Sequence, residues 1–229
     1  PNLARLVMSL GKYAYGFRGD DVYVHQYVAG SATLETVAGK LAFSLETNYP
    51  YDGEMRFTMP AGRYGMNLRI PGYTKGRYEI LLNGQAVQAE CEKGYARVAR
   101  EWAEGDLLTL RLAFAPRRVY ADPRIREDIG RVAVMRGPLV FCLEQADNGT
   151  LLSGVWLDAD SPLEERWTGD KLGGVMEITA RGARLTPQTD SAPYLDTPPE
   201  KSPTQLTFIP YYAWANRGEG EMTVWVREG

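Results

Sequence analysis

Histidine and cysteine are scarce in this sequence, whose 229 residues include one histidine, His25, and two cysteines, Cys91 and Cys142. A metal site needs cysteine, histidine and carboxylate ligands that converge, usually at short spacing, and no such spacing occurs here. A serine triad would need His25 as its base, and the sequence contains no Gly-x-Ser-x-Gly motif. We therefore predict neither a metal site nor a catalytic triad in this chain. The cysteines suggest no disulfide framework, and we expect two free, buried thiols.

The sequence also lacks a run of about 18 apolar residues and lacks a basic cluster. We therefore expect no membrane-spanning helix. With a formal net charge of −3 and with Arg124 and Arg126 alternating with acidic residues, we expect no nucleic-acid partner. The first residues lack the features of a signal peptide, which leaves the location open and favours a cytoplasmic over a secreted protein. The chain begins at Pro1 rather than at methionine, which suggests a piece of a longer protein.

Apolar residues at spacings of three and four predict one short helix at the start of the chain. The stripe consists of Leu3, Leu6, Val7, Leu10 and Ala14. Pro1 suits the first turn and Gly16 suits the end, so we assign residues 1–17 to this helix. A single helix cannot bury its stripe alone. It must therefore pack on sheets or on polypeptide that this chain lacks.

From Asp21 onward the apolar period changes to two, which predicts β-strands. The turn at residues 48–53 and the Asn83-Gly84 pair are hairpin signals between alternating runs. A charged, proline-punctuated crossing then begins at Pro116 and leads into apolar strands at residues 132–135 and 139–143. A proline-rich loop is expected over residues 187–203. We predict an all-β chain of two antiparallel, jelly-roll-like β-sandwich units, residues 18–120 and 121–229, preceded by the short helix.

Aromatic residues crowd together near the end of the chain and give the best candidate binding site. Exposed rings beside amide and guanidinium donors hold carbohydrate in many sandwich proteins. The alternative is that these rings fill a core or a domain interface. The candidate sugar contacts are Tyr211, Tyr212, Trp214, Asn216 and Arg217.

Carboxylates on or near strands could serve a glycosidase, which needs two of them at a defined separation. Sequence cannot place such a pair, and for each candidate we favour a solvated strand face. The candidates are Glu46, Asp52, Glu144 and Glu177. No catalytic residue is assigned.

Five blocks of sequence, in order along the chain, resemble the C-terminal part of bacterial β-L-arabinofuranosidases of glycoside hydrolase family 127. The resemblance rests on the five blocks together and not on any one of them. The blocks are PNLARL at 1–6, NYPYDG at 48–53, RIPGY at 69–73, MRGPLV at 135–140 and PYYAWANR at 210–217.

The resemblance implies an (α/α) barrel followed by two β-sandwich regions, with the chemistry in the barrel. There a zinc-held cysteine thiolate is the proposed nucleophile and a glutamate is the acid/base. The nucleophile's motif reads Cys-Cys-Pro-Pro-Asn, and this chain's match starts at Pro1-Asn2, just after those cysteines. Neither Cys91 nor Cys142 matches a zinc-ligand position. The resemblance therefore implies that zinc and all catalytic residues belong to a barrel that is missing here.

Two hypotheses follow. In the first, the chain is a non-catalytic scaffold that supports the barrel and an oligomer interface, and is inactive alone. In the second, it is a carbohydrate-binding module whose aromatic platform is centred on Trp214, and ring exposure separates the two. An independent enzyme based on strand carboxylates is the least favoured interpretation, because no general base stands out. The uncovered helix stripe also predicts self-association of this chain.

Overall fold

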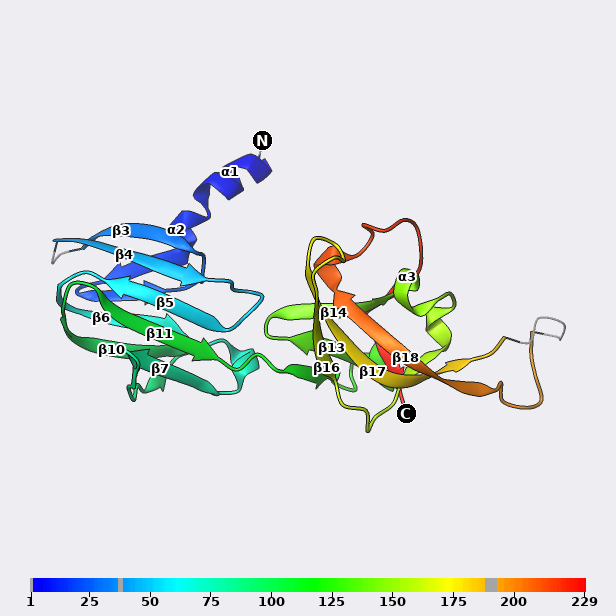
Figure 1. Ribbon diagram of the computed structural model, residues 1–229. Coiled ribbons are helices and arrows are strands. Elements are labelled where there is room, and N and C mark those ends of the chain that lie inside the picture. Colours follow the sequence, from blue (N-terminus) through cyan, green and yellow to red (C-terminus); the bar gives the residue numbers. More distant parts are fainter. Residues whose placement is uncertain (1, 37–38, 188–192) are drawn as a thin grey trace. The chain divides into compact units, whose positions relative to one another are not determined.

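The computed structural model describes residues 2–36, 39–187 and 193–229, and the chain forms two compact units (Figure 1). The first unit is Pro1–Phe114 and the second is Ala115–Gly229. Strands dominate both, which confirms the predicted all-β class. Pro1 and residues 188–192, which belong to the predicted helix and the predicted proline-rich loop, lie outside the described residues.

The first unit is a sandwich of two sheets. One sheet has the order β1-β2-β6-β10-β9 and the other has the order β3-β4-β5-β11-β7-β8. Neighbouring strands are antiparallel, except that β2 pairs with β6 in parallel. The strands are β1 Tyr15–Arg18, β2 Asp21–Val24, β3 Gly30–Thr36, β4 Gly39–Thr47, β5 Glu54–Met59, β6 Gly62–Arg69, β7 Tyr78–Leu82, β8 Gln85–Ala86, β9 Cys91–Glu92, β10 Tyr95–Trp102 and β11 Asp106–Leu112, with a 3-10 turn η1 at Gly72–Thr74.

Buried apolar and exposed polar side chains alternate along the strands, and the buried ones form the core of this unit. In β5 the side chains of Met55, Phe57 and Met59 are buried between the two sheets, whereas Thr58 faces outward. The buried indole of Trp102 donates its N–H to the Tyr64 carbonyl at 3.0 Å, which satisfies its polar atom. Asn83 and Gly84 have φ of 48° and 81° and close the hairpin between β7 and β8, as the sequence predicts.

The second unit consists of a single large sheet with the order β12-β13-β20-β15-β17-β18-β14-β19, and β16 pairs with β17. Because β13 also pairs with β14, the path from β13 to β14 closes on itself and surrounds one core. The strands are β12 Pro116–Val119, β13 Arg131–Arg136, β14 Leu139–Glu144, β15 Val155–Leu157, β16 Glu164–Thr168, β17 Val175–Leu185, β18 Lys201–Pro210, β19 Met222–Thr223 and β20 Val226–Glu228. The short helical turns are η2 Arg126–Asp128, α3 Gln145–Asn148, η3 Leu152–Gly154 and η4 Tyr211–Ala213.

Two predicted boundaries differ from those in the structure. The sequence places the division between units after residue 120, whereas the contacts divide the chain between Phe114 and Ala115. The reason is that β12, at the start of the crossing, pairs with β13 of the second unit. The predicted loop at 187–203 ends in a strand, because Lys201 to Pro203 begin β18 and pair with β17.

The N-terminal helix is shorter than predicted. Helix α1 spans Asn2–Ser9 and α2 spans Gly11–Ala14, after which β1, Tyr15–Arg18, pairs with β2. No residue of α1 is buried, and the side chains of Leu3, Leu6 and Leu10 are 75%, 52% and 46% exposed. In the part of the chain that the structure describes, no helix has the length and hydropathy needed to cross a membrane.

Candidate functional site

The predicted aromatic cluster lies on the segment that follows β18, which we call the aromatic loop, residues 211–217. Tyr211 and Trp214 stack with ring centroids 6.1 Å apart and an interplanar angle of 23°. Tyr211, Tyr212 and Trp214 are 45%, 52% and 37% exposed. Between them, Ala213 is buried against Cys142 and Ile209, which anchors the loop to the body of the second unit. The rings thus present an aromatic face on this chain.

Polar contacts fix the backbone of the aromatic loop. The Ala215 N–H donates to Glu144 Oε1 at 3.2 Å, and Ala215 adopts a φ of 65°, which is uncommon for a residue with a Cβ. The Asn216 side-chain amide donates to the carbonyls of Ala213 and Trp214 at 3.0 and 3.2 Å. Arg217 Nε donates to Glu144 Oε2 at 3.0 Å. These contacts hold the stacked rings in one arrangement.

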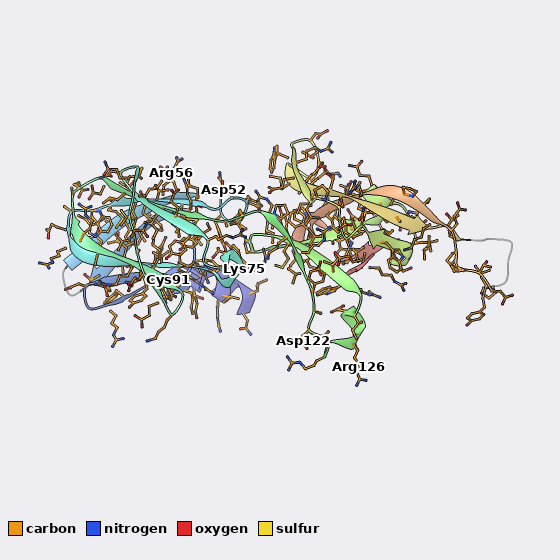
Figure 2. The ribbon with its side chains drawn as sticks, turned by 90° about the horizontal axis from the view of Figure 1, so that it is seen from below. Asp52, Arg56, Lys75, Cys91, Asp122 and Arg126 are labelled. Carbon is orange, nitrogen blue, oxygen red and sulfur yellow. The ribbon has the colours of Figure 1, made fainter. Side chains whose placement is uncertain are left out.

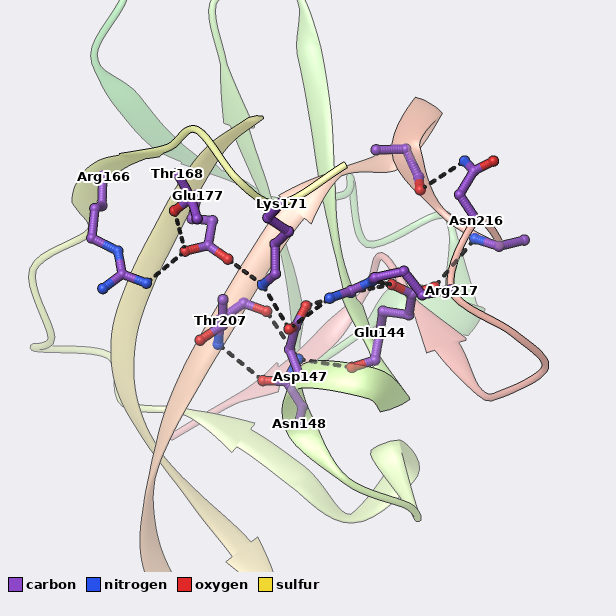
Figure 3. Close-up of polar contacts among 12 residues, drawn as sticks. Glu144, Asp147, Asn148, Arg166, Thr168, Lys171, Glu177, Thr207, Asn216 and Arg217 are labelled. Atoms are coloured by element: carbon purple, nitrogen blue, oxygen red, sulfur yellow. Dashed lines mark hydrogen bonds and ion pairs between the residues drawn. The ribbon is translucent and has the colours of Figure 1, made fainter. Parts of the chain in front are cut away.

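Beneath the loop lies a group of paired charges, the acid–base cluster, made of Glu144, Asp147, Lys171, Glu177 and Arg217 (Figure 3). Arg217 bridges Glu144 and Asp147, and its Nη1 lies 2.9 Å from Asp147 Oδ1. Lys171 contacts Glu177 and lies 2.6 Å from Asp147 Oδ1. The cluster links the segment between β16 and β17 to the aromatic loop, and Leu172 beside Lys171 packs against the same small core as Ala213.

Two further groups satisfy the most deeply buried carboxylate. The Glu177 side chain is 1% exposed, and its Oε2 accepts from Arg166 Nη2 at 2.9 Å and from the Thr168 hydroxyl at 2.8 Å. With Arg166 included, three cations face three carboxylates. A buried charge is tolerated when it is paired and hydrogen-bonded, and each of these acids meets that condition.

The surroundings of Asp147, Glu177 and Arg217 favour the charged form of each side chain. Burial opposes ionisation of Asp147, but hydrogen bonds from Arg217 and Lys171 outweigh it and lower its pKa. For Glu177, burial is likewise outweighed by hydrogen bonds from Lys171, Arg166 and Thr168, so its pKa is also lowered. Hydrogen bonding to Asp147 is the main cause that raises the pKa of Arg217. Asp147, Glu177 and Arg217 therefore stay charged at neutral pH.

The predicted sugar contacts differ in their surroundings in the structure. Tyr211, Tyr212 and Trp214 present their rings to solvent, whereas Arg217 directs its donors to Glu144 and Asp147. Arg217 thus positions the loop, and its guanidinium is already engaged. Glu144 and Glu177 were predicted on a solvated face, and this was wrong, because both are buried. Glu144 pairs with Arg217, 73 residues away, and Glu177 pairs with Lys171 of the loop between β16 and β17. Glu46 is exposed as expected, and Asp52 is half-buried.

The described residues contain no group of three or more histidine, cysteine or acidic side chains that could hold a metal ion. Both cysteines are free, and the prediction of burial is right for Cys142 and wrong for Cys91, which is exposed on β9 (Figure 2). Burial, with a smaller effect of Glu144, raises the pKa of Cys142 to about 12. A zinc ligand or nucleophile must be a thiolate, so Cys142 does not fit a zinc site. His25 Nδ1 lies 2.7 Å from the Tyr95 hydroxyl, a contact within the first unit.

These features describe a two-domain, all-β polypeptide with an exposed aromatic loop and no convergent metal site among its described residues. Residues 21–114 match the family model for the β-L-arabinofuranosidase GH127 middle domain, and residues 116–227 match that for the glycoside hydrolase family 127 C-terminal domain. The chain belongs to glycoside hydrolase family 127, of which it contains these two domains. The two matches meet where the two structural units divide.

The relatives are considerably longer than this chain. It is 36% identical over 245 residues to the non-reducing end β-L-arabinofuranosidase of Bifidobacterium longum subsp. longum, covering 99% of this chain and 36% of that protein. A solved GH127 β-L-arabinofuranosidase from Geobacillus stearothermophilus T6 is 40% identical, with a TM-score of 0.93 over 100% of this chain and 37% of its own. Another solved GH127 β-arabinofuranosidase is 33% identical with a TM-score of 0.90, again over 100% of this chain and 38% of its own.

Removal of Arg217 is expected to destabilise the second unit far more than removal of Arg166. The Arg217→Ala substitution leaves Glu144 and Asp147 buried without their bridging cation, which should lower the free energy of unfolding by about 3–5 kcal/mol. Arg166 is 69% exposed, and its loss should cost less than about 1 kcal/mol. Urea denaturation followed by tryptophan fluorescence measures both. Equal losses would contradict a structural role for the cluster.

Acid is expected to weaken the second unit. The pKa values of Asp147 and Glu177 are lowered in the folded state, so the unfolded chain binds protons at higher pH. The stability that these two carboxylates contribute is fully present above their pKa values in the unfolded chain, about 4. It is lost as the pH falls through their lower pKa values in the folded chain. Urea midpoints measured from pH 7 to pH 3 should fall steeply below about pH 4. The dependence of the urea midpoint on pH should be weaker in Glu177→Gln. It should be unchanged in Glu219→Gln, because the Glu219 side chain is exposed.

Proposed function

We propose that this chain is the non-catalytic, C-terminal part of a β-L-arabinofuranosidase-like glycoside hydrolase and supports a catalytic barrel. Zinc, its cysteine ligands and the acid/base glutamate would then belong to that barrel. The observation that carries the proposal is the uncovered apolar stripe of α1, given a chain that spans little more than a third of its relatives' length. Leu3, Leu6 and Leu10 resemble residues of an interface whose other side is absent.

The stripe also indicates how the support would work. Alternating apolar side chains of the strands fill the cores of both units, whereas α1 and the turn after it expose three leucine side chains, Leu3, Leu6 and Leu10, to solvent. Burying one leucine is worth about 1.5–3 kcal/mol, so a partner that covers the stripe gains substantial affinity from it. The barrel is the partner that the proposal favours. In its absence a second copy of this chain would cover the same residues.

The proposal is tested by activity and by association. The pure chain should release no L-arabinose from a β-L-arabinofuranoside, with or without added zinc. It should self-associate in light scattering, and it should bind the portion of the Geobacillus relative that precedes the matching region. Leu6→Glu should weaken both associations about tenfold, because it places a charge where the association would bury a leucine.

Arg5→Glu is the matched control, because it introduces the same side chain on the opposite face of α1 and should leave association unchanged. Zinc-stimulated arabinose release by the chain alone would overturn the assignment as a non-catalytic part. A chain that is monomeric and does not bind the preceding portion of the Geobacillus relative would contradict the scaffold function.

A carbohydrate-binding role is the second candidate, and the exposure of the aromatic loop favours it. Tyr211 and Trp214 form a stacked, rigidly supported face, and an exposed aromatic face can pack against the C–H face of a sugar ring. The Asn216 side chain lies against the backbone of the same loop, at the carbonyls of Ala213 and Trp214. Its amide nitrogen is engaged with the backbone, so its oxygen would be the group that accepts from a sugar hydroxyl.

Titration with L-arabinose oligosaccharides should quench tryptophan fluorescence in a saturable way, more strongly than xylo- or gluco-oligosaccharides. Trp214→Ala should abolish the response with the fold intact. The control is Trp167→Ala, because Trp167 is another exposed tryptophan of the same unit, at 60% exposure. Quenching that survives Trp214→Ala and disappears with Trp167→Ala would rule out the aromatic loop as the site.

A further inference from the structure

The second unit contains a groove of about 990 Å³, which we call the polar groove. It is lined by residues of β17, of β18 and of the segment 158–164. Figure 1 shows β17 and β18 as the long paired strands of this unit. Its volume is in the range of ligand sites in proteins. None of the residues of the aromatic loop lines it, so it is a separate surface.

The floor of the polar groove is the outer face of the sheet. Ala183 pairs with Pro203, and Arg181 pairs with Gln205, while the alternate pair of Ala180 with Leu206 is buried in the core. Two small apolar side chains therefore lie beside two long polar ones. A ligand on this floor would meet a flat apolar patch next to hydrogen-bonding groups.

The wall of the groove is held rigidly. Arg118 Nη2 donates to the carbonyls of Asp158 and Ser161 at 3.0 and 2.8 Å. Ser161 is 2% exposed, and its hydroxyl accepts from the Arg181 backbone N–H at 2.8 Å. The Asp160 N–H donates to Asp158 Oδ1 at 3.0 Å, closing a turn. A wall already fixed in this way loses little conformational freedom when a ligand binds.

The charges in the groove identify the class of ligand. Asp158, Asp160 and Glu164 carry three negative charges, while Arg181 and Lys201 carry two positive ones, giving −1. This balance disfavours an anion. The Arg181–Asp158 pair is 3.6 Å apart with side chains 69% and 41% exposed, a weak ion pair whose members can turn to a ligand.

We propose that the polar groove binds a neutral oligosaccharide. Sugar hydroxyls both donate and accept, which matches the mixture of carboxylates, cations and the Gln205 amide, and Pro203 offers an apolar contact for C–H groups. The proposal goes beyond the scaffold function, because it gives this chain a ligand of its own. The site is independent of α1 and of the aromatic loop.

Calorimetric titration and amide chemical-shift mapping of the chain with arabino-oligosaccharides test the proposal, with xylo-oligosaccharides and oligogalacturonate as comparison ligands. Shifts should map to residues 158–164, 179–183 and 203–205. The double variant Arg181→Ala, Gln205→Ala should weaken binding about tenfold, the effect of losing a charged hydrogen bond. Both side chains are exposed, so the fold should persist, which the melting temperature verifies.

Arg166→Ala is the matched control, because Arg166 does not line the groove, and this variant should bind as the unchanged chain does. Binding that is lost with Trp214→Ala and kept in the groove variant would overturn the proposal in favour of the aromatic loop. Tighter binding of oligogalacturonate than of neutral oligosaccharides would overturn the ligand class. No binding at millimolar concentrations of the neutral oligosaccharides would overturn the site, while leaving the α1 association test unaffected.

Discussion

The acid–base cluster is the constraint on which the aromatic surface of the second unit depends. A carboxylate with 1% exposure, such as Glu177, is tolerated only if cations and hydroxyls surround it. Lys171 meets that requirement at Glu177 and Arg217 meets it at Glu144, and each of these cations belongs to a loop. The burial of charge therefore specifies the positions of both loops. The stacked rings of Tyr211 and Trp214 are held on the surface as a consequence.

The two units enclose their apolar cores in different ways. The first closes two sheets around an apolar core, while the second wraps one sheet on itself and adds a charged cluster outside its apolar core. Each unit fills its own core, so neither needs α1 for burial. The exposed leucines of α1 are consequently best explained by a partner beyond these two domains, which is why the scaffold function is preferred over an independent one.

The second unit carries two surfaces suited to carbohydrate, with different chemistry. The aromatic loop offers ring faces with few free polar groups, because Arg217 is committed to the cluster. The polar groove offers many polar groups over a small apolar floor. Stacking tolerates many sugars, whereas hydrogen bonds at fixed positions discriminate among them. The two surfaces would therefore contribute differently to recognition.

The sequence by itself determined the all-β class, the hairpins such as Asn83-Gly84 and the apolar stripe of α1, because alternation and turn chemistry act over a few residues. It also indicated the aromatic loop. Only the tertiary structure decided that Glu144 and Glu177 are buried, that Arg217 is a positioning residue, and that Arg181 and Gln205 line one groove. The Glu144–Arg217 ion pair and the Arg181–Gln205 strand pair each join segments that are far apart in the sequence, and Glu177 meets Lys171 only because the loop between β16 and β17 folds back. Local propensity carries no information about which charge will lie beside a given strand.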